Sequence, residues 1–315
     1  MASFFDRVLI TGSGGMLGNA VYPHFAANYP SVLATDINQY NKRRRAPWLR
    51  EEMDVTNRKQ VREVMAGYKP DLVLHLAALV DMEICEEDPE LSELLNVTAT
   101  QIVAEEAERV GATVVYISTG GVFDGGKPNP PDNYYTEEDP VDSICVYGKT
   151  KHGGELHVRN ICSKCYVVRP GWMTGGGYAL DRKFVGMILD QIERGEKVIY
   201  GVDDKWGTPT YTYAFAKNLD VLVKTGQYGT YHMVCKEPGT RFDIAKGIVE
   251  VCGRTDIELQ RVKSDFFQAR FSAPRPPNEI LVNQALEDLG INQMPTWREA
   301  FEEYIPRHFP HLMRK

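Results

Sequence analysis

The stretch that decides the fold is Val8-Leu-Ile-Thr-Gly-Ser-Gly-Gly-Met-Leu-Gly18, near the start of the chain. It joins an apolar, β-branched run to a glycine-rich turn and the beginning of a helical pattern. Glycine lacks a Cβ, so the backbone can turn sharply there and approach a pyrophosphate closely. The helix N-terminus offers free N–H groups and a positive dipole end to that anion. The stretch therefore predicts a dinucleotide-binding turn made by Gly12, Gly15, Met16, Leu17 and Gly18.

Short apolar runs alternate with helical patterns through the first half of the chain. Nearly uninterrupted runs such as Leu72–Leu76 are typical of strands that are covered on both faces of a sheet. The repeated alternation predicts a Rossmann-type α/β fold, a doubly wound parallel sheet with helices on both faces. The expected strands are Val8–Thr11, Ser31–Thr35, Leu72–Leu76, Thr113–Ser118 and Tyr166–Arg169, and the expected helices are Gly15–Ala27, Arg58–Gly67, Glu90–Val110 and Tyr147–Asn160.

The pattern changes after Pro170. Gly175-Gly-Gly177, Gly207-Thr-Pro209 and Ala273-Pro-Arg-Pro-Pro277 interrupt shorter elements in the rest of the chain. We expect a cofactor-binding domain over residues 1–170 and a smaller, loop-rich C-terminal substrate-binding lobe over residues 171–315. This boundary is approximate, because later segments can complete a sheet begun by earlier ones.

Composition excludes several classes of protein. Of the 315 residues, 43% are hydrophobic and 25% are charged, a balance unlike that of a disordered chain. The net charge of −7 argues against nucleic acid as a partner, since phosphate binding depends on clustered Lys and Arg. The start of the chain lacks a signal-peptide pattern, and the run Leu72–Val80 is too short to span a bilayer. We therefore expect a cytoplasmic chain with no membrane partner.

His152, His157, Cys162 and Cys165 are the residue types that bind zinc. Their spacing argues against a site, because five residues of helix turn about 500° and leave the two histidines roughly 140° apart. Cys165 also opens a strand-like run, in which alternate side chains face opposite sides. We expect reduced thiols and no metal.

Several residues are placed to contact a nicotinamide cofactor. Asp36 closes the second expected strand, where a carboxylate can accept hydrogen bonds from the adenosine ribose and would repel a 2′-phosphate. This favours NADH slightly, while the basic run 42–45 (Lys-Arg-Arg-Arg) could neutralise a 2′-phosphate and keeps NADPH as an alternative. The remaining predicted cofactor contacts are Asp54 and Val55 beside the adenine, Ala77 and Ala78 at the end of the third strand, and Tyr147 and Lys151.

Tyr147-Gly-Lys-Thr-Lys151 places a phenol and an ammonium at i and i+4, on one face of a helix. A nearby cation is expected to lower the pKa of the tyrosine, which can then pass a proton to a ketone oxygen as hydride arrives at the carbon. Ser118-Thr119 ends the fourth strand, at the edge where open α/β sheets bind ligands. Thr119, Tyr147 and Lys151 together predict the acid–base group of a carbonyl reductase.

The glycine turn, the Ser-Thr strand end and Tyr-Gly-Lys-Thr-Lys resemble the extended short-chain dehydrogenase/reductase superfamily. Val168-Arg-Pro-Gly-Trp172, Trp206-Gly-Thr-Pro-Thr-Tyr211 and Ala273-Pro-Arg-Pro-Pro-Asn278 resemble, more specifically, the dTDP-4-dehydrorhamnose reductase family. The resemblance implies reduction at C4 of a nucleotide-linked 4-keto-6-deoxyhexose by NAD(P)H. It further implies that Thr119 bonds the keto oxygen, that Tyr147 protonates it, and that Lys151 orients the tyrosine and the ribose.

On the substrate side, the resemblance implies that Trp172 lies near the sugar and that Arg275 and Asn278 belong to the nucleotide-sugar side. A guanidinium fork at Arg275 suits a diphosphate. The chain departs from the family pattern after the Ser-Thr pair, where Gly120 and Gly121 replace Asp-Tyr. We therefore expect a wider pocket with fewer contacts to the sugar. The expected partners are a nucleotide-sugar substrate and a second copy of the chain in a homodimer.

The sequence can be compared with the requirements of three other functions. A 4,6-dehydratase needs an acid and a base beside the threonine, which Gly120 and Gly121 do not supply. A nucleotide-sugar 4-epimerase needs only the hydroxyl, tyrosine and lysine with tightly held NAD, so the catalytic residues leave it open. A non-catalytic regulatory subunit, like the beta subunit of methionine adenosyltransferase that these reductases resemble, is the alternative from another class.

Overall fold

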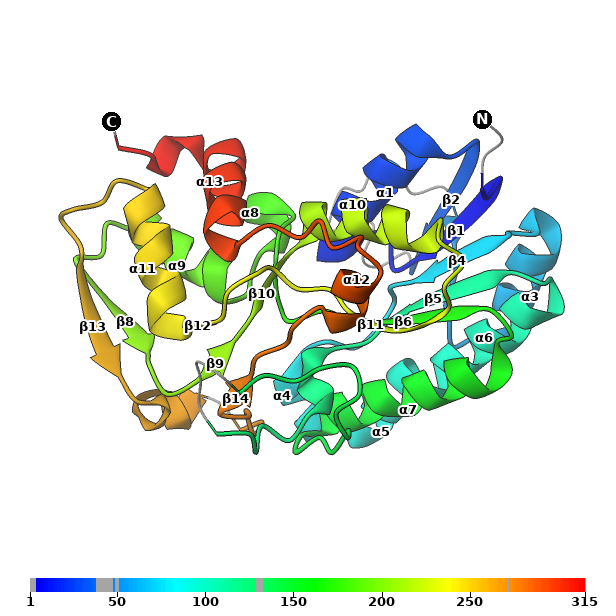
Figure 1. The fold of residues 1–315 in the computed structure, drawn as a ribbon, viewed down its shortest axis with the longest axis horizontal. Helices are drawn as coiled ribbons and strands as arrows, with labels where there is room; N and C mark the ends of the chain where they lie inside the picture. Colours follow the sequence, from blue (N-terminus) through cyan, green and yellow to red (C-terminus); the bar gives the residue numbers. More distant parts are fainter. Residues whose placement is uncertain (1–3, 38–47, 49–50, 129–132, 271, 315) are drawn as a thin grey trace.

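The computed structural model describes residues 4–37, 48, 51–128, 133–270 and 272–314. Within them, seven strands form a parallel sheet in the order β11-β6-β5-β4-β1-β2-β3 (Figure 1). The strands are β1 (Arg7–Thr11), β2 (Ser31–Asp36), β3 (Glu51–Glu52), β4 (Leu72–His75), β5 (Thr113–Ile117), β6 (Cys165–Arg169) and β11 (Gly229–His232). The chain winds outward from β1 to β3, then returns to β4 on the other side of β1. The doubly wound Rossmann fold is confirmed, and its strand order reverses between β1 and β4, the kind of position at which such folds bind ligands.

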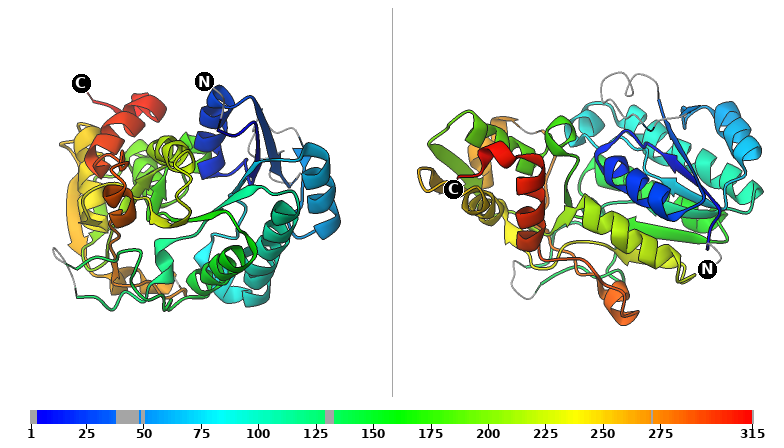
Figure 2. Two further views of the ribbon diagram at one scale, coloured as in Figure 1. Left: turned by 45° about the vertical axis from the view of Figure 1, so that its right-hand side comes forward. Right: turned by 90° about the horizontal axis from the view of Figure 1, so that it is seen from above.

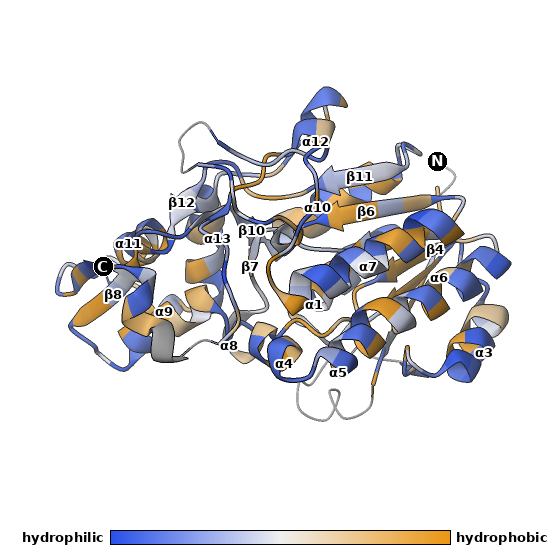
Figure 3. Ribbon diagram, turned by 90° about the horizontal axis from the view of Figure 1, so that it is seen from below, coloured by the Kyte–Doolittle hydropathy of each residue, from blue (hydrophilic) through white to orange (hydrophobic). Residues whose placement is uncertain are grey.

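Helices cover both faces of the sheet. The first face packs against α1 (Met16–Asn28) and α10 (Thr212–Val223), and the second against α3 (Arg58–Tyr68), α6 (Ala99–Arg109) and α7 (Val146–Ile161). Along β1, Val8 and Ile10 join the core of the first face while Leu9 joins that of the second. This alternation explains why the strand is apolar throughout. Figure 3 shows hydrophobic residues gathered along the strands and hydrophilic residues along α3 and α6.

The sheet does not end with residue 170. After the chain has entered the second lobe, α10 returns to pack beside α1, and β11 pairs in parallel with β6, Thr230 opposite Val167. The expected division between residues 1–170 and 171–315 therefore does not coincide with the edge of the sheet. The chain crosses between the two parts more than once, as the views in Figure 2 show.

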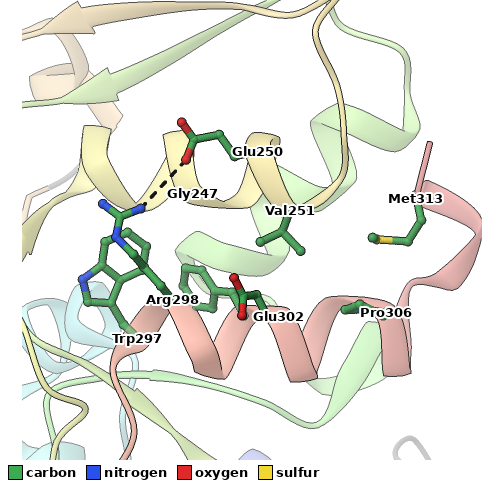
Figure 4. Close-up of a pocket in the computed structure, with 9 residues that line it drawn as sticks. Gly247, Glu250, Val251, Trp297, Arg298, Glu302, Pro306 and Met313 are labelled. Atoms are coloured by element: carbon green, nitrogen blue, oxygen red, sulfur yellow. Dashed lines mark ion pairs between the residues drawn. The ribbon is translucent and has the colours of Figure 1, made fainter. Parts of the chain in front are cut away.

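The second lobe is built from short strands and three longer helices, α9 (Phe184–Glu193), α11 (Arg241–Val251) and α13 (Trp297–His308). Both α11 and α13 begin with a capping box, at Thr240 with Asp243 and at Thr296 with Glu299. A pocket of about 400 Å³ lies between these two helices, with Trp297 and Arg298 among its lining residues (Figure 4). The paired strands are β7 (Trp172–Thr174) with β10 (Pro209–Tyr211), β8 (Val198–Val202) with β13 (Glu258–Val262), and β9 (Trp206–Gly207) between β12 (Gly239–Thr240) and β14 (Asn278–Glu279).

Several shorter helical elements lie in both parts of the chain. They are α4 (Met82–Glu87), α5 (Pro89–Glu93), a π-helical turn at Leu94–Thr98 that leads into α6, a 3₁₀ turn at Gly120–Val122, α8 (Gly177–Leu180) and α12 (Gln284–Asp288). Among the described residues, no helix is both long and apolar enough to cross a membrane.

Candidate active site

The glycine-rich turn brings bare backbone to the position between β1 and β4 where the strand order reverses. Gly12 has φ +66°, and a Cβ there would lie 2.6 Å from the backbone nitrogen of Ala77. A Cβ on Gly18 would lie 2.3 Å from the carbonyl oxygen of Ser13. Only glycine fits either position, so the turn lies directly against the end of β4 and the start of α1. This is the backbone arrangement that a dinucleotide pyrophosphate requires.

The other predicted residues of the turn differ in what they can offer a cofactor. Gly15 is the N-cap of α1 and has no side chain to satisfy the first free N–H groups of the helix. Leu17 packs into the core, whereas Met16 is half-buried. Gly15 and Leu17 therefore have only backbone to present, and contact of the turn with a cofactor stays a prediction.

Asp36 ends β2 beside this turn. Its carboxylate accepts hydrogen bonds from the backbone N–H of Gly14 at 2.7 Å and from that of Ile37 at 2.8 Å. The charge is thereby held beside the turn, where the adenosine ribose is expected. The basic run 42–45, which kept NADPH as an alternative, lies outside the described residues.

The remaining predicted cofactor contacts lie at the ends of β3 and β4. Asp54 accepts hydrogen bonds from the backbone N–H and the hydroxyl of Thr56, at 2.9 and 2.7 Å, and Val55 is buried. Ala77 and Ala78 are half-buried, and the backbone N–H of Ala77 bonds the hydroxyl of Thr11 at 3.3 Å. Their small side chains leave the end of β4 open beside Gly12.

Thr119, Tyr147 and Lys151 come together at the carboxyl edge of the sheet. Thr119 follows β5, its hydroxyl accepts a hydrogen bond from Gly121 N–H at 3.1 Å, and it lies near enough to the Tyr147 hydroxyl to lower the pKa of that group. Lys151 lies one turn further along α7, with Nζ 4.1 Å from the ring centroid of the β5 residue Tyr116. Thr119 and Lys151 are buried, whereas Tyr147 is half-buried.

Glycines in α7 bring this helix close to the strand ends. A Cβ on Gly148 would lie 2.0 Å from the carbonyl oxygen of Gly121, and one on Gly154 would lie 2.2 Å from the hydroxyl of Tyr116. The helix N-cap is Cys145, whose Sγ accepts a hydrogen bond from Gly148 N–H at 3.4 Å. The close approach is what places Tyr147 against Thr119.

Burial dominates the electrostatics of the site. Burial raises the pKa of Tyr147 well above its ordinary value, and the hydrogen bond from Thr119 offsets only part of this. Burial also lowers the pKa of Lys151 to about 7, against the opposing charge of Glu155. The expected lowering of the tyrosine pKa by the lysine is therefore wrong for this protein without ligands, because loss of water outweighs the neighbouring cation.

Sequence reasoning missed a buried ion pair behind α7. Glu155 accepts two hydrogen bonds from Arg169, both at 2.8 Å, and a third from the hydroxyl of Ser118 at 2.5 Å. Burial favours protonation of Glu155, but these bonds and the charge of Arg169 outweigh it and hold its pKa below the ordinary range. The pair ties α7 to the ends of β5 and β6. The available signal in the sequence was the position of Glu155, four residues after Lys151 on the same helix.

On the lobe side, Trp172 is fixed by three neighbours. Its indole N–H donates to a carboxylate oxygen of Glu279 at 2.9 Å. A Cβ on Gly207 would lie 2.3 Å from its Cζ2, so the backbone of β9 packs directly on the ring. The guanidinium carbon of Arg241 lies 3.5 Å from the ring centroid. The charge of Glu279 contributes to the raised pKa of Tyr147, so Glu279 lies within electrostatic reach of that tyrosine.

Arg275 and Asn278 are bound within the protein. Arg275 pairs with Glu83 of α4 at 2.6 Å, and the same carboxylate accepts bonds from Ser272 and Ala273. The buried side-chain amide of Asn278 donates to carbonyl oxygens of residues 127, 128 and 133. The structure therefore uses both residues to hold loops, and it does not bring the Asn278 amide to Thr119 or Tyr147.

Comparison with known proteins identifies the family. Residues 6–309 match the model described as the RmlD substrate binding domain. The chain belongs to this family. A dTDP-4-dehydrorhamnose reductase of Clostridium acetobutylicum is 30% identical, with a TM-score of 0.85 over 96% of this chain and 99% of that one. The reductase of Bacillus anthracis, solved in complex with NADP, is 28% identical with a TM-score of 0.84 over 96% and 99% of the two chains. Methionine adenosyltransferase 2 subunit beta of Mus musculus is 30% identical over 98% of this chain and 89% of its own.

Gly120 and Gly121 stand where the resemblance to the RmlD family led us to expect Asp-Tyr. The two positions differ in the space available for a side chain. A Cβ at Gly121 would make only ordinary contacts, 3.5 Å from the Thr119 hydroxyl and 3.8 Å from Cδ1 of Tyr147. A Cβ at Gly120 would lie 3.0 Å from Cδ1 of Leu281. Space for a side chain therefore remains beside the reactive hydroxyls at Gly121, whereas Leu281 fills much of the space beside Gly120.

Proposed function

We propose that this protein reduces the C4 ketone of a nucleotide-linked 4-keto-6-deoxysugar with NAD(P)H. The observation that carries the proposal is the grouping of Thr119, Tyr147 and Lys151 at the carboxyl edge of the sheet, where Thr119 acts on the Tyr147 hydroxyl and Lys151 lies one helical turn from it. The three residues lie at the same edge of the sheet as the glycine-rich turn between β1 and α1. Gly12 and Gly18 leave the backbone of that turn uncovered by side chains. The family supports NAD(P)H-dependent reduction of a sugar ketone, and the C4 ketone is the finer step proposed here.

Three residues of the chain have separate roles in the proposed reduction. A bound nicotinamide supplies the hydride. Tyr147 has a raised pKa and so carries its proton at neutral pH, ready to pass it to the oxygen that becomes an alkoxide. In this proposal Thr119, which acts on the Tyr147 hydroxyl, offers the same ketone oxygen a second donor. Lys151, whose pKa burial lowers to about 7, bonds the nicotinamide ribose and, when protonated, stabilises the phenolate once the proton has left.

For the cofactor, we infer a preference for NADH over NADPH. The support is Asp36, whose carboxylate is fixed beside the glycine turn by Gly14 N–H. A fixed negative charge at the end of β2 accepts hydrogen bonds from ribose hydroxyls and repels a 2′-phosphate.

The test is loss of reduced-nicotinamide absorbance with purified protein and freshly generated nucleotide-4-keto-6-deoxysugars. The panel contains dTDP- and GDP-linked sugars, with and without 3,5-epimerase, each with NADH and NADPH. We expect turnover with one of them, and at least a hundredfold lower kcat in Tyr147→Phe with cofactor affinity nearly unchanged. Loss of cofactor binding in Tyr147→Phe would contradict the assigned role.

A regulatory subunit is the second candidate, favoured by the 30% identity to methionine adenosyltransferase 2 subunit beta over 98% of this chain. Bound cofactor with no turnover across the panel is the outcome that this candidate predicts. NAD that remains bound through purification, with C4 inverted and no net oxidation of cofactor, would instead indicate a 4-epimerase.

A further inference from the structure

Arg241, the first residue of α11, has a guanidinium held by aromatic rings and by no acceptor. Its guanidinium carbon lies 3.5 Å from the ring centroid of Trp172 and 4.9 Å from that of Phe184. Within the described residues it has no hydrogen bond and no carboxylate within ion-pair distance, although the side chain is only partly accessible. Five N–H donors are thus positioned without a protein partner.

The other buried arginines among the described residues are paired. Arg169 lies against Glu155, and Arg254 lies against Asp256 with Nε 2.8 Å from a carboxylate oxygen. Pairing is the ordinary condition for a buried guanidinium, because an unpaired one loses its water without compensation. The exception at Arg241 indicates that its partner is not part of the chain.

Cations and carboxylates both lie near Arg241. The charges of Lys183, at the start of α9, and of Arg275 act on that of Arg241. Of the carboxylates, Glu279 acts on Arg241, whereas Asp181 and Asp81 act on Lys183. Burial raises the pKa of Glu279 and of Asp181, so these two carboxylates tend toward protonation. Because none of the three lies within ion-pair distance of its guanidinium, Arg241 is left to bind an anionic ligand.

We propose that Arg241, supported by Lys183 and held in place by Trp172, binds the diphosphate of the nucleotide-linked substrate. The identity of the anion rests on the proposed function. A planar guanidinium fork binds phosphate oxygens in a bidentate manner, which a lone ammonium does not. In such a substrate the diphosphate is joined at C1, across the sugar ring from C4. Glu279 acts electrostatically on both Arg241 and Tyr147, so the proposed anion site and the proposed proton donor share this neighbour.

Arg275 and Trp172 then have other roles than those expected from the sequence. Arg275, expected from the sequence to face the diphosphate, is bound to Glu83 and to the carbonyl oxygen of Ala273. Trp172, expected near the sugar, has Gly207 packed on its ring and Arg241 stacked on it. The tryptophan then acts as the support of Arg241 rather than as a surface for the sugar.

The experiment is calorimetric binding of dTDP, UDP and GDP, and of the matching nucleosides, to the protein saturated with NADH or with NADPH. The variants are Arg241→Met, which keeps the apolar stem on Trp172, and Arg241→Lys, which keeps the charge. The matched control is Arg298→Met, because Arg298 also stacks on a tryptophan, Trp297, at 4.2 Å but pairs with Glu250 (Figure 4). Thermal melting of each variant reports whether it is folded.

We expect Arg241→Met to weaken the preferred nucleoside diphosphate at least tenfold, Arg241→Lys to weaken it less, and Arg298→Met to leave it unchanged. Affinity for the nucleoside and for NADPH should stay the same in all variants. Unchanged diphosphate affinity in a folded Arg241→Met, or no binding of any nucleoside diphosphate by the unmodified protein, would overturn the inference. The reductase proposal is judged separately, because turnover by the unmodified protein does not depend on the outcome for Arg241.

Discussion

Lys151 shows how burial changes the chemistry of a single residue. Its side chain is 1% exposed, and burial lowers its pKa from 10.5 to about 7. Below pH 7 the folded protein carries this buried cation. Between pH 7 and 10.5 the unfolded chain binds a proton that the folded chain does not, so the contribution of Lys151 to stability rises with pH.

The first prediction follows from that sign. The free energy of unfolding of the unmodified protein, relative to Lys151→Met, should rise above pH 7 with a slope of at most about 1.4 kcal/mol per pH unit. Urea unfolding of the cofactor-free proteins at pH 6, 7, 8 and 9 measures the difference. A difference that does not change with pH would show that Lys151 keeps its ordinary pKa in the folded state.

Asp36 is the residue on which the cofactor preference depends. Asp36→Asn removes the charge but keeps an oxygen that can accept the Gly14 N–H bond seen at 2.7 Å. We expect the ratio of kcat/KM for NADPH to that for NADH to rise at least tenfold, since the repulsion of a 2′-phosphate is lost. Glu63→Gln, on the exposed surface of α3, is the charge-matched control and should leave the ratio as it was. An equal ratio in both variants would remove Asp36 from the specificity argument.

At the scale of elements, the packing of α7 against the Gly120–Val122 turn sets the catalytic geometry. Gly148→Ala puts a Cβ 2.0 Å from the carbonyl oxygen of Gly121, so the helix must move away from the turn that follows Thr119. We expect kcat for sugar reduction to fall at least tenfold. Gly67→Ala, in α3 with nothing within 4 Å of the added Cβ, is the control and should keep full activity while stabilising by about 0.5–1 kcal/mol. Equal activity in the two variants would show that α7 can shift without cost to the reaction.

The ion pair between Glu155 and Arg169 joins three elements and should matter for stability. Glu155→Gln leaves the buried guanidinium of Arg169 without its counter-charge, which we expect to cost about 3–5 kcal/mol of unfolding free energy. Glu105→Gln breaks the partly exposed pair with Arg58 and should cost less than about 1 kcal/mol. Urea unfolding at pH 7 compares the two, and similar small losses would mean that Ser118 and water satisfy Arg169 and Glu155 separately.

The elements that the sequence predicts well are those with a local pattern. The helix expected at Arg58–Gly67 is found at Arg58–Tyr68, and the one expected at Glu90–Val110 begins at Pro89 and ends at Arg109. The last strand of the sheet, β11, is short and only partly apolar, and its place beside β6 depends on α10 packing against α1. No local pattern reports such a long-range arrangement.

The same distinction holds for the site. Tyr147 and Lys151 could be identified as candidate site residues because both lie in one helix, where residues four apart share a face. Arg241, Glu279 and the bond between Glu83 and Arg275 join residues from distant parts of the chain, so their roles depend on the folded geometry. The expectation for Arg275 came from the family resemblance and from its residue type, and neither revealed that Glu83 would be its partner.

At the scale of the whole molecule, the site lies where the sheet meets the second lobe. Thr119, Tyr147 and Lys151 belong to the sheet and its helix, whereas Trp172, Arg241 and Glu279 belong to the lobe. The bond between Glu83 of α4 and Arg275 fastens the two parts together. Because the chain crosses between the sheet and the second lobe more than once, the position of the lobe residues relative to the sheet residues depends on the entire fold.

Transfer of deuterium from NADH or NADPH that carries two deuterium atoms at nicotinamide C4 tests whether this protein reduces the sugar ketone. The protein is incubated with the nucleotide-4-keto-6-deoxysugar panel, and the sugar product is analysed by NMR and mass spectrometry. We predict one deuterium at sugar C4 for each cofactor oxidised, and loss of this product in Tyr147→Phe. Cofactor that binds but transfers no deuterium to any sugar, or deuterium found at another carbon, would contradict the proposed reduction.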